Sequence, residues 1–217
     1  MILIPVKNLK TAKQRLAPVL DQAQRTALAE AMLHDVFDAV GNWAERPPVA
    51  VVSSDPSATD LAKHFDFEVI SDNDNKSETA AIEMATQVCE ARGIESTLVI
   101  PGDIPLVQSS ELDNILKAAP PLGSVLVPAA DGRGTNAAFR RPSSLFPLRF
   151  GNDSFKPHFA AASGTDKPCI VLLLPGVALD VDNASDLRDL VAAPGETRAQ
   201  RLARQWNLED YPLAANE

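Results

Sequence analysis

Short apolar runs alternate with longer amphipathic stretches along the chain, and this alternation constrains the fold more than any other feature. The runs are rich in β-branched residues or leucine, as expected of strands buried on both faces of a parallel sheet. The predicted strands are Met1–Pro5, Val49–Ser53, Phe67–Ser71, Ser96–Ile100, Ser124–Pro128 and Ile170–Pro175. Because such strands alternate with helical stretches, the predicted class is α/β, with a Rossmann-like, mostly parallel sheet flanked by helices.

The clearest predicted helix is Gln22–Val40, where apolar residues recur at helical spacing and Asp21 can cap the first turn. The other predicted helices are Asp60–His64, Glu78–Arg92, Ser110–Ala118 and Asp186–Ala192. Two segments, Asn8–Val19 and Ala129–Thr165, show no sustained period. Since long irregular stretches inside compact domains are commonly binding loops, we expect ligands to bind there.

Size and charge limit the classes of partner. A chain of 217 residues with 45% hydrophobic content can bury one substantial core, so we predict a single domain, 1–217. The 29 acidic residues outnumber the 20 basic ones, and such a surface repels polyanions. Nucleic acid is therefore excluded as an expected partner.

Cellular context follows from cysteine usage and hydropathy. The chain has only two cysteines, Cys89 and Cys169, too few and too far apart for a disulfide scaffold or a zinc site. No apolar run reaches the roughly 18 residues needed to span a bilayer, and the N-terminus lacks the pattern of a signal peptide. We expect a cytoplasmic protein without a membrane contact. The tail from Ala193 onward is polar but carries Leu202, Trp206 and Leu208, which can pack on the body or form a homodimer.

A basic loop follows the first predicted strand. Lys7, Lys10, Lys13 and Arg15 place four of the 20 basic residues within nine positions of an acidic chain. The loop after a strand of an α/β sheet lies over the carboxyl edge, where ligands of this class bind. These cations suit a triphosphate, and the alternative is a solvated basic turn.

Acidic residues recur at two other predicted strand ends. Asp103 follows the strand Ser96–Ile100 and could hold Mg²⁺ against nucleotide phosphates, although Gly-Asp before proline is also a common turn. Asp180 and Asp182 alternate on an extended segment, so both side chains should face one side. Like charges on one face repel, which indicates either a bound cation or exposure to solvent. Asp186 is expected in the first turn of the next helix, where its charge suits the helix dipole.

The second irregular segment contains glycines beside hydroxyl and amide side chains, in Gly132-Arg133-Gly134-Thr135-Asn136 and around Phe150-Gly151. Backbone N–H groups in such loops can bind an anion. Ser154 could head an anion-binding helix or be an ordinary N-cap. His158 could contact a phosphate or be a structural hydrogen-bonding residue.

In order along the chain, these features resemble the 2-phospho-L-lactate guanylyltransferase family, which makes the activated precursor of the deazaflavin coenzyme F420. The match spans nearly the whole chain. It rests on Ile4-Pro5-Val6-Lys7 with Lys13-Gln14-Arg15-Leu16-Ala17-Pro18, on Pro101-Gly102-Asp103-Ile104-Pro105-Leu106, on Gly134-Thr135-Asn136, on Phe150-Gly151 with Ser154-Phe155 and His158, and on Asp180-Val181-Asp182 ahead of Asp186-Leu187.

The resemblance implies a nucleotidyltransferase fold of the molybdenum-cofactor guanylyltransferase type and transfer of GMP from GTP to a phosphorylated three-carbon acid. The implied halves are 1–100 for the nucleotide, 101–192 for metal and acceptor, and 193–217 as a tail. Implied ligands of Mg²⁺ are Asp103, Asp180 and Asp182. Implied contacts of GTP are Pro5, Lys7, Lys13, Arg15 and Thr79. Implied contacts of the acceptor are Thr135, Asn136, Gly151, Ser154 and His158. Lys13, Asp103 and Asp182 would be catalytic.

One segment departs from the family pattern. Members often show Gly-Leu-Asn-x-Ala-Leu near the base, where this chain has Ser77-Glu78-Thr79-Ala80-Ala81-Ile82. The acceptor also stays open among phospholactate, phosphoenolpyruvate and 3-phosphoglycerate. Two alternatives remain: cytidylyl or uridylyl transfer to a sugar or polyol phosphate, and a nucleotide-binding regulator without turnover.

Overall fold

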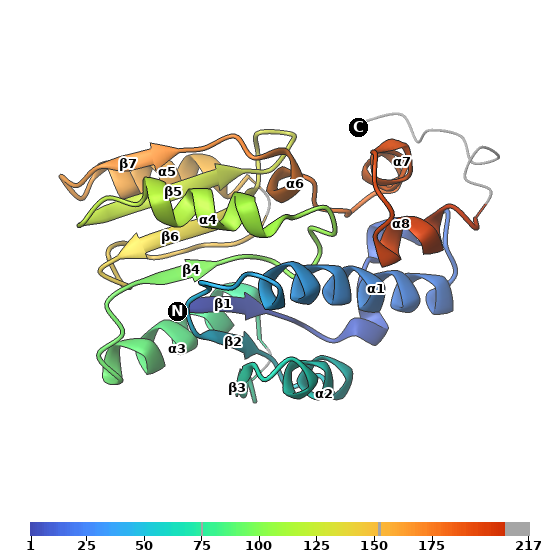
Figure 1. Cartoon of the computed structure of the whole chain (residues 1–217), viewed down its shortest axis with the longest axis horizontal. Coiled ribbons are helices and arrows are strands. Elements are labelled where there is room, and N and C mark those ends of the chain that lie inside the picture. The colour runs from blue at the N-terminus through green and yellow to red at the C-terminus, as the bar shows by residue number, and fades with distance from the viewer. Residues whose placement is uncertain (75, 152, 207–217) are drawn as a thin grey trace.

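Seven strands form one sheet in the computed structural model, which describes residues 1–74, 76–151 and 153–206 (Figure 1). The strands are β1 (Ile2–Pro5), β2 (Val49–Val52), β3 (Glu68–Ile70), β4 (Thr97–Val99), β5 (Gly123–Pro128), β6 (Thr135–Arg141) and β7 (Cys169–Val171). Their order is β3-β2-β1-β4-β6-β5-β7, and β6 alone runs against its two neighbours. The predicted α/β class with a mostly parallel sheet is confirmed.

The segment 129–165 was predicted to be irregular, and this prediction is wrong for strand β6, which lies within it. It pairs antiparallel with β4 through Leu98↔Phe139 and with β5 through Leu126↔Ala138. Its sequence has two arginines, an asparagine and no apolar alternation, so periodicity gave no signal for a strand. Tertiary contacts supply what the pattern lacks, because the buried Arg140 donates to the carbonyl of Phe146 at 2.6 Å.

Eight α-helices and two 3₁₀ turns connect these strands in the described part of the chain. The helices are α1 (Gln22–Gly41), α2 (Pro56–His64), α3 (Glu78–Ala91), α4 (Ser109–Ala118), α5 (Phe155–Ser163), α6 (Pro175–Ala178), α7 (Ala184–Ala192) and α8 (Arg198–Ala203), and the turns are η1 (Leu9–Thr11) and η2 (Gln14–Leu16). All predicted helices are present, and Asp21 caps α1 through the N–H of Gln24. Helix α2 begins four residues before its predicted start, because Asp55 caps it and Pro56 suits its first turn. Helix α5 lies in the segment predicted to be irregular.

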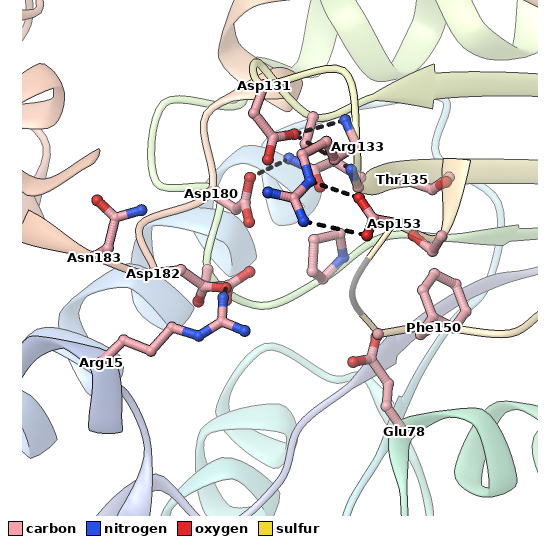
Figure 2. Close-up of a pocket in the computed structure, with 17 residues that line it drawn as sticks. Arg15, Glu78, Asp131, Arg133, Thr135, Phe150, Asp153, Asp180, Asp182 and Asn183 are labelled. Atoms are coloured by element: carbon pink, nitrogen blue, oxygen red, sulfur yellow. Dashed lines mark hydrogen bonds and ion pairs between the residues drawn. The ribbon is translucent and has the colours of Figure 1, made fainter. Parts of the chain in front are cut away.

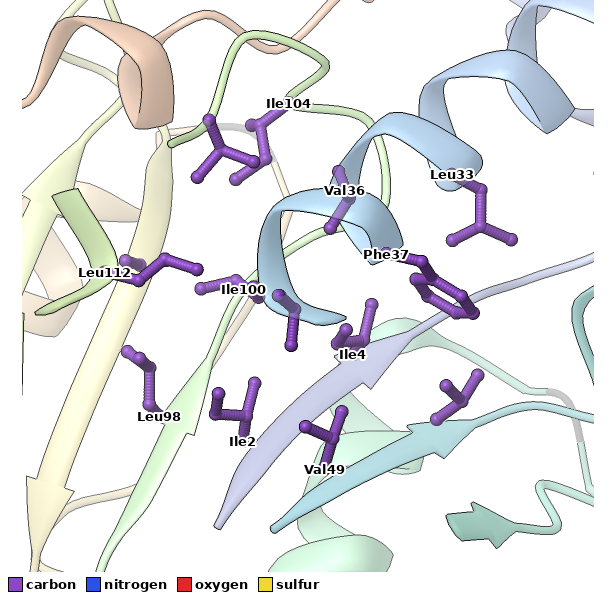
Figure 3. Packing of buried hydrophobic residues seen from close by; sticks show 14 of the residues in the cluster. Ile2, Ile4, Leu33, Val36, Phe37, Val49, Leu98, Ile100, Ile104 and Leu112 are labelled. Carbon is purple, nitrogen blue, oxygen red and sulfur yellow. The ribbon is translucent and has the colours of Figure 1, made fainter. Parts of the chain in front are cut away.

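Helices cover both faces of the sheet. On one face, α1, α2, α4 and α6 pack on residues of every central strand, with Ile4, Phe37 and Ile100 fully buried (Figure 3). On the other face, α3 and α5 pack on the alternate residues of the same strands, including Leu3 and Leu126. Alternation along each strand therefore buries both of its faces.

A smaller apolar cluster holds the C-terminal helices on α1. Its centre contains Met32 of α1, Val181 from the segment before α7, and Leu187 of α7, and Trp206 packs on its side. Trp206 thus packs on the body, and Leu208 lies outside the described residues; the homodimer stays a prediction. Within the residues that the structure describes, no helix is long and apolar enough to cross a membrane.

Candidate active site

Two pockets open side by side at the carboxyl edge of the parallel strands. The larger, about 490 Å³, is lined by polar residues of the loops around β6 and α5 and is called here the polar pocket (Figure 2). The smaller, about 270 Å³, lies under the basic loop after β1 and is called the basic-loop pocket. The two pockets share one wall, which consists of Glu78, Pro101, Asp103 and Asp182.

The ammonium group of Lys13 joins the two acids of the shared wall. Its Nζ donates to Asp103 Oδ2 and, at 2.9 Å, to Asp182 Oδ1. The Lys13 side chain is 7% exposed, while those of Asp103 and Asp182 are 28% and 41% exposed. Burial opposes the charge of Lys13, but the two carboxylates outweigh it and raise the pKa of this lysine. The structure thus brings together the three residues predicted to be catalytic.

Backbone contacts fix the two acidic segments against each other. The N–H of Val181 donates to the carbonyl of Asp103 at 3.2 Å, and the Val181 side chain is fully buried. Asp186, in the first turn of α7 as predicted, accepts from the N–H groups of Asp182 and Asn183 at 2.9 and 3.0 Å. The fold's own hydrogen bonds therefore hold residues far apart in sequence at one point.

Asp180 lies nearby in the polar pocket but does not touch Lys13 in the same way. Its Oδ1 accepts from Asn136 Nδ2 at 2.9 Å, and Asn136 also donates to the carbonyls of Val177 and Ala178 at 3.0 Å. Burial and then the charges of Asp103 and Asp182 raise the pKa of Asp180 to about 6. Asn136, predicted to contact the acceptor, lines the pocket, but its side-chain amide donates to Asp180 and positions that carboxylate.

The carboxylates of Asp103 and Asp182 suit a divalent cation that takes its remaining ligands from water and substrate. Two carboxylates, from Asp103 and Asp182, already share one cationic atom, Lys13 Nζ. Among the residues that the structure describes, no three or more acidic, histidine or cysteine side chains gather closely enough to hold a metal ion alone. Mg²⁺ characteristically binds through one or two carboxylates plus water and substrate phosphates, so the residues present fit it.

The other residues predicted for GTP lie around the basic-loop pocket. Pro5 and Lys7 line it, and Lys7 Nζ donates to Asp72 Oδ2 at 2.5 Å. Arg15 lies on the polar-pocket side with its guanidinium 3.7 Å from Asp182 Oδ2. The Thr79 hydroxyl instead accepts from the N–H of Phe150 at 2.9 Å and so anchors the loop before Gly151. Its contact with the base stays a prediction.

A cradle for an anion forms where β6 and α5 begin. Thr135, Gly151 and Ser154 all line the polar pocket, and Gly151 has a φ of +133°, which favours glycine. Ser154 holds the N-cap position of α5, but its side chain makes no capping hydrogen bond. A hydroxyl and a helix N-terminus therefore face the same space, an arrangement that favours negative charge.

His158 lies behind this cradle rather than in it. The ring is 1% exposed, its Nε2 accepts from the N–H of Arg149 at 2.7 Å, and Nδ1 lies 2.9 Å from Thr135 Oγ1. Because Nε2 accepts, the neutral ring carries its proton on Nδ1 and donates it to Thr135, whose own proton is then free for a ligand. The structural alternative for His158 thus has direct contacts in its favour.

His158 should make stability fall in mild acid. Burial and then the charge of Arg140 lower the pKa of His158 to about 4, whereas an unfolded histidine titrates near 6.5. The folded state binds fewer protons between these values, so stability is fully present above about pH 6.5 and falls by up to about 3 kcal/mol as pH drops towards 4. Urea unfolding between pH 4 and 6.5 gives the free energy of unfolding of the wild type and of His158→Gln. This free energy should fall more steeply with decreasing pH in the wild type than in the variant. The exposed His64→Gln is the matched control, and equal pH profiles for wild type and His158→Gln would contradict the assignment.

Several pocket residues escaped the sequence analysis as site residues. Arg133 donates from Nε and Nη2 to Asp153 at 2.5 and 3.2 Å, closing the outer side of the polar pocket (Figure 2). Asp131 accepts from the N–H groups of Arg133 and Gly134 and so shapes the turn before β6. Glu78 lines both pockets. The Gly-Arg-Gly motif pointed to the loop, but nothing in the sequence paired Arg133 with an acid twenty residues later.

Comparison with solved structures shows which proteins share the fold. A chain of Desulfovibrio desulfuricans G20 assigned to the nucleotide-diphospho-sugar transferases is similar with a TM-score of 0.76 at 18% identity, covering 94% of this chain and 93% of the other. CMP:2-keto-3-deoxy-manno-octonic acid synthetase, solved with CTP, has a TM-score of 0.56 at 14% identity, covering 88% and 96%. The fold is that of a single-domain nucleotidyltransferase.

Sequence comparison then gives the family. The family described as guanylyl transferase CofC like matches residues 1–212, and the chain belongs to it. It is 35% identical over 204 residues to phosphoenolpyruvate guanylyltransferase of Roseiflexus castenholzii, covering 94% of this chain and 93% of the relative. Identity is 32% to 2-phospho-L-lactate guanylyltransferase of Methanothermobacter thermautotrophicus, covering 99% and 94%. The chain is also 30% identical to 3-phospho-D-glycerate guanylyltransferase of Colwellia psychrerythraea, and the match covers 94% of this chain and 97% of the relative.

Proposed function

We propose that this guanylyltransferase moves GMP from GTP to a small phosphorylated three-carbon acid on the route to coenzyme F420. The observation that carries the proposal is the shared wall: two pockets suited to anions meet at Asp103 and Asp182. A transfer between two anions needs two adjoining sites and positive charge between them, more than it needs acid–base groups. The names of the relatives supply phosphoenolpyruvate, 2-phospho-L-lactate and 3-phosphoglycerate as candidate acceptors.

GTP is assigned to the basic-loop side. Lys7 and Lys13 are contributed by the loop after β1, and Arg15 reaches Asp182 from the same loop. These cations would bind the phosphates of GTP, with Pro5 under the nucleotide and Thr79 near the base. The half 1–100 would thus bind mainly the nucleotide, as the resemblance implies.

The acceptor is assigned to the polar pocket. The Thr135 hydroxyl, oriented by His158, would bind the acceptor phosphate together with Ser154 and the N–H groups near Gly151. One oxygen of that phosphate would attack the α-phosphorus of GTP in line. A new P–O bond forms as the bond to the β-phosphate oxygen breaks, and pyrophosphate leaves.

Mg²⁺ is assigned to Asp103 and Asp182, with Asp180 beside them. When bound, the ion would neutralise charge on the phosphates and on the leaving pyrophosphate. The chain's own residues orient the reactants: Asn136 fixes Asp180, and Asp186 fixes the backbone of Asp182. Lys13 bridges the two acids in the structure, and its ammonium group would also help to neutralise the α-phosphate of GTP.

The test is a panel of the four ribonucleoside triphosphates with the three acids and with sugar and polyol phosphates, scored by pyrophosphate release with Mg²⁺. We expect release with GTP and at least one of the acids. Release with CTP or UTP and a sugar or polyol phosphate alone would replace guanylyl transfer by the cytidylyl or uridylyl alternative. Binding of nucleotide with no release in any combination would favour the non-catalytic regulator.

A further inference from the structure

One acid of the shared wall, Glu78, belongs to none of the residue sets proposed to bind GTP, the acceptor or Mg²⁺. Glu78 is the first residue of α3, follows the capping residue Ser77, and lines both pockets. Figure 2 shows it at the polar pocket. Neither the relatives' names nor the residue sets of the sequence analysis assign it a function. Its carboxylate is half-buried and, in the part of the chain that the structure describes, accepts no hydrogen bond and forms no ion pair.

An unpartnered carboxylate in such a place is costly to the free protein. Desolvation disfavours its charge, and the nearby charges of Asp103 and Asp182 add repulsion that Lys13 and Lys7 only partly offset. The neighbouring acids each have donors: Lys13 for Asp103 and Asp182, Asn136 for Asp180. Uncompensated polar groups of this kind are concentrated at sites where a ligand completes the hydrogen bond.

The chemistry of the substrates limits which of their groups can complete it. Their phosphates and carboxylates are ionised at neutral pH, so they cannot donate a hydrogen bond to the ionised form of Glu78 and would be repelled by it. Hydroxyl and amino groups remain, together with the guanine N1–H that lies beside the amino group, because each can donate to a carboxylate. GTP carries ribose hydroxyls and this pair of guanine donors, and of the three candidate acids only 3-phosphoglycerate carries a free hydroxyl.

We propose that Glu78 is a specificity-determining residue whose carboxylate accepts a hydrogen bond from a hydroxyl or amino group of a substrate at the wall between the two pockets. The proposal rests on the proposed function and extends it to the choice of substrate. A site built to bind a donor rejects the analogue that lacks it, because the carboxylate is then left unpaired.

The experiment compares wild type, Glu78→Gln and Glu78→Leu with matched pairs of substrates. One arm compares GTP with 2′-deoxyGTP, which lacks a ribose hydroxyl, and with ITP, which lacks the guanine amino group. The other arm sets 3-phosphoglycerate against phosphoenolpyruvate and 2-phospho-L-lactate. In one arm, Glu78→Leu should lower the ratio of kcat/KM for the donor-bearing substrate to that for its analogue by about tenfold or more. Glu78→Gln keeps an acceptor oxygen and should recover part of the ratio, and Glu83→Gln, exposed on the same helix, is the control.

The arm that responds identifies the source of the donor, nucleotide or acid. Both Glu78 variants should also melt at or above the wild-type temperature, because they remove an uncompensated charge. A lower melting temperature with equal losses for every substrate would make Glu78 merely structural and overturn the proposal, as would unchanged ratios in both arms. Calorimetric binding of the same pairs with Mg²⁺ gives the ratios even if no guanylyl transfer occurs, so failure of the proposed function is scored separately.

Discussion

Replacing Asp103 with asparagine should lower kcat for nucleotidyl transfer by about a thousandfold or more, with the fold intact. Asparagine has the same shape, but its amide cannot balance a divalent cation, and transition-state charge stabilisation by one group is typically worth a factor of about 10²–10³. Loss of a proposed metal ligand should remove more, because the ion would act on both phosphate groups. Pyrophosphate release with saturating GTP and Mg²⁺ gives kcat, and thermal unfolding reports the fold.

Asp113→Asn is the matched control for this variant. The Asp113 side chain is 28% exposed, as Asp103 is, and it also pairs with a lysine, Lys117. It lies on α4, away from both pockets, and should keep its full activity. If Asp103→Asn retained kcat within a factor of about three, the assignment of this acid to the metal would be wrong.

The second large effect concerns Lys13→Met, which should reduce kcat/KM for GTP by about a hundredfold or more and also destabilise the metal-free protein. The lysine is the shared partner of two acids, so its loss leaves Asp103 and Asp182 facing each other without a cation. Breaking a buried pair costs about 3–5 kcal/mol, and because both acids are partly exposed here we expect about 1–3 kcal/mol. Urea unfolding in the presence of a chelator measures this difference.

Divalent ions should reverse that destabilisation. On the proposed metal assignment, Lys13 of the wild type competes with the ion for the two carboxylates, so Mn²⁺ without nucleotide should bind Lys13→Met more tightly than wild type. Mg²⁺ at millimolar concentration should raise the melting temperature of Lys13→Met more than that of wild type or of the surface control Lys117→Met. Equal shifts in all of these proteins would show that Lys13 does not share its position with a cation.

The elements that the sequence predicted are those whose apolar spacing is set by the sheet itself. The strand at Val49–Ser53 and the helix at Gln22–Val40 bury residues at the periods of a strand and a helix, and both appear within a residue or two of their predicted ends. The predicted basic loop and acidic segments could likewise be placed at the carboxyl edge, because parallel strands end on one side. What carried these predictions was the local spacing of apolar residues and the position of loops at the carboxyl edge of a parallel sheet.

The elements that the sequence missed depend on distant partners. Strand β6 is stabilised by pairing with β4 and β5 and by contacts of the buried Arg140 with Thr86 and Phe146, none of which leaves a period in its own residues. Helix α5 begins at Phe155, directly after its N-cap Ser154, which the sequence offered as a possible head of a helix, and it packs on β5 and β7. Tertiary context overrode weak local propensity in both.

For the site, the sequence by itself determined which residue types are present: a run of cations after the first strand, an acid after Ile100 and two alternate acids at Asp180 and Asp182. Only the tertiary structure decided which of them meet. In the structure Lys13 contacts both Asp103 and Asp182. His158 lies behind Thr135 and not in the pocket, and Glu78 lies at the wall between the pockets without a hydrogen-bond donor among the described residues. Charges interact over a few ångströms of space, and only the folded chain brings Lys13 that close to acids 90 and 169 residues away in the sequence.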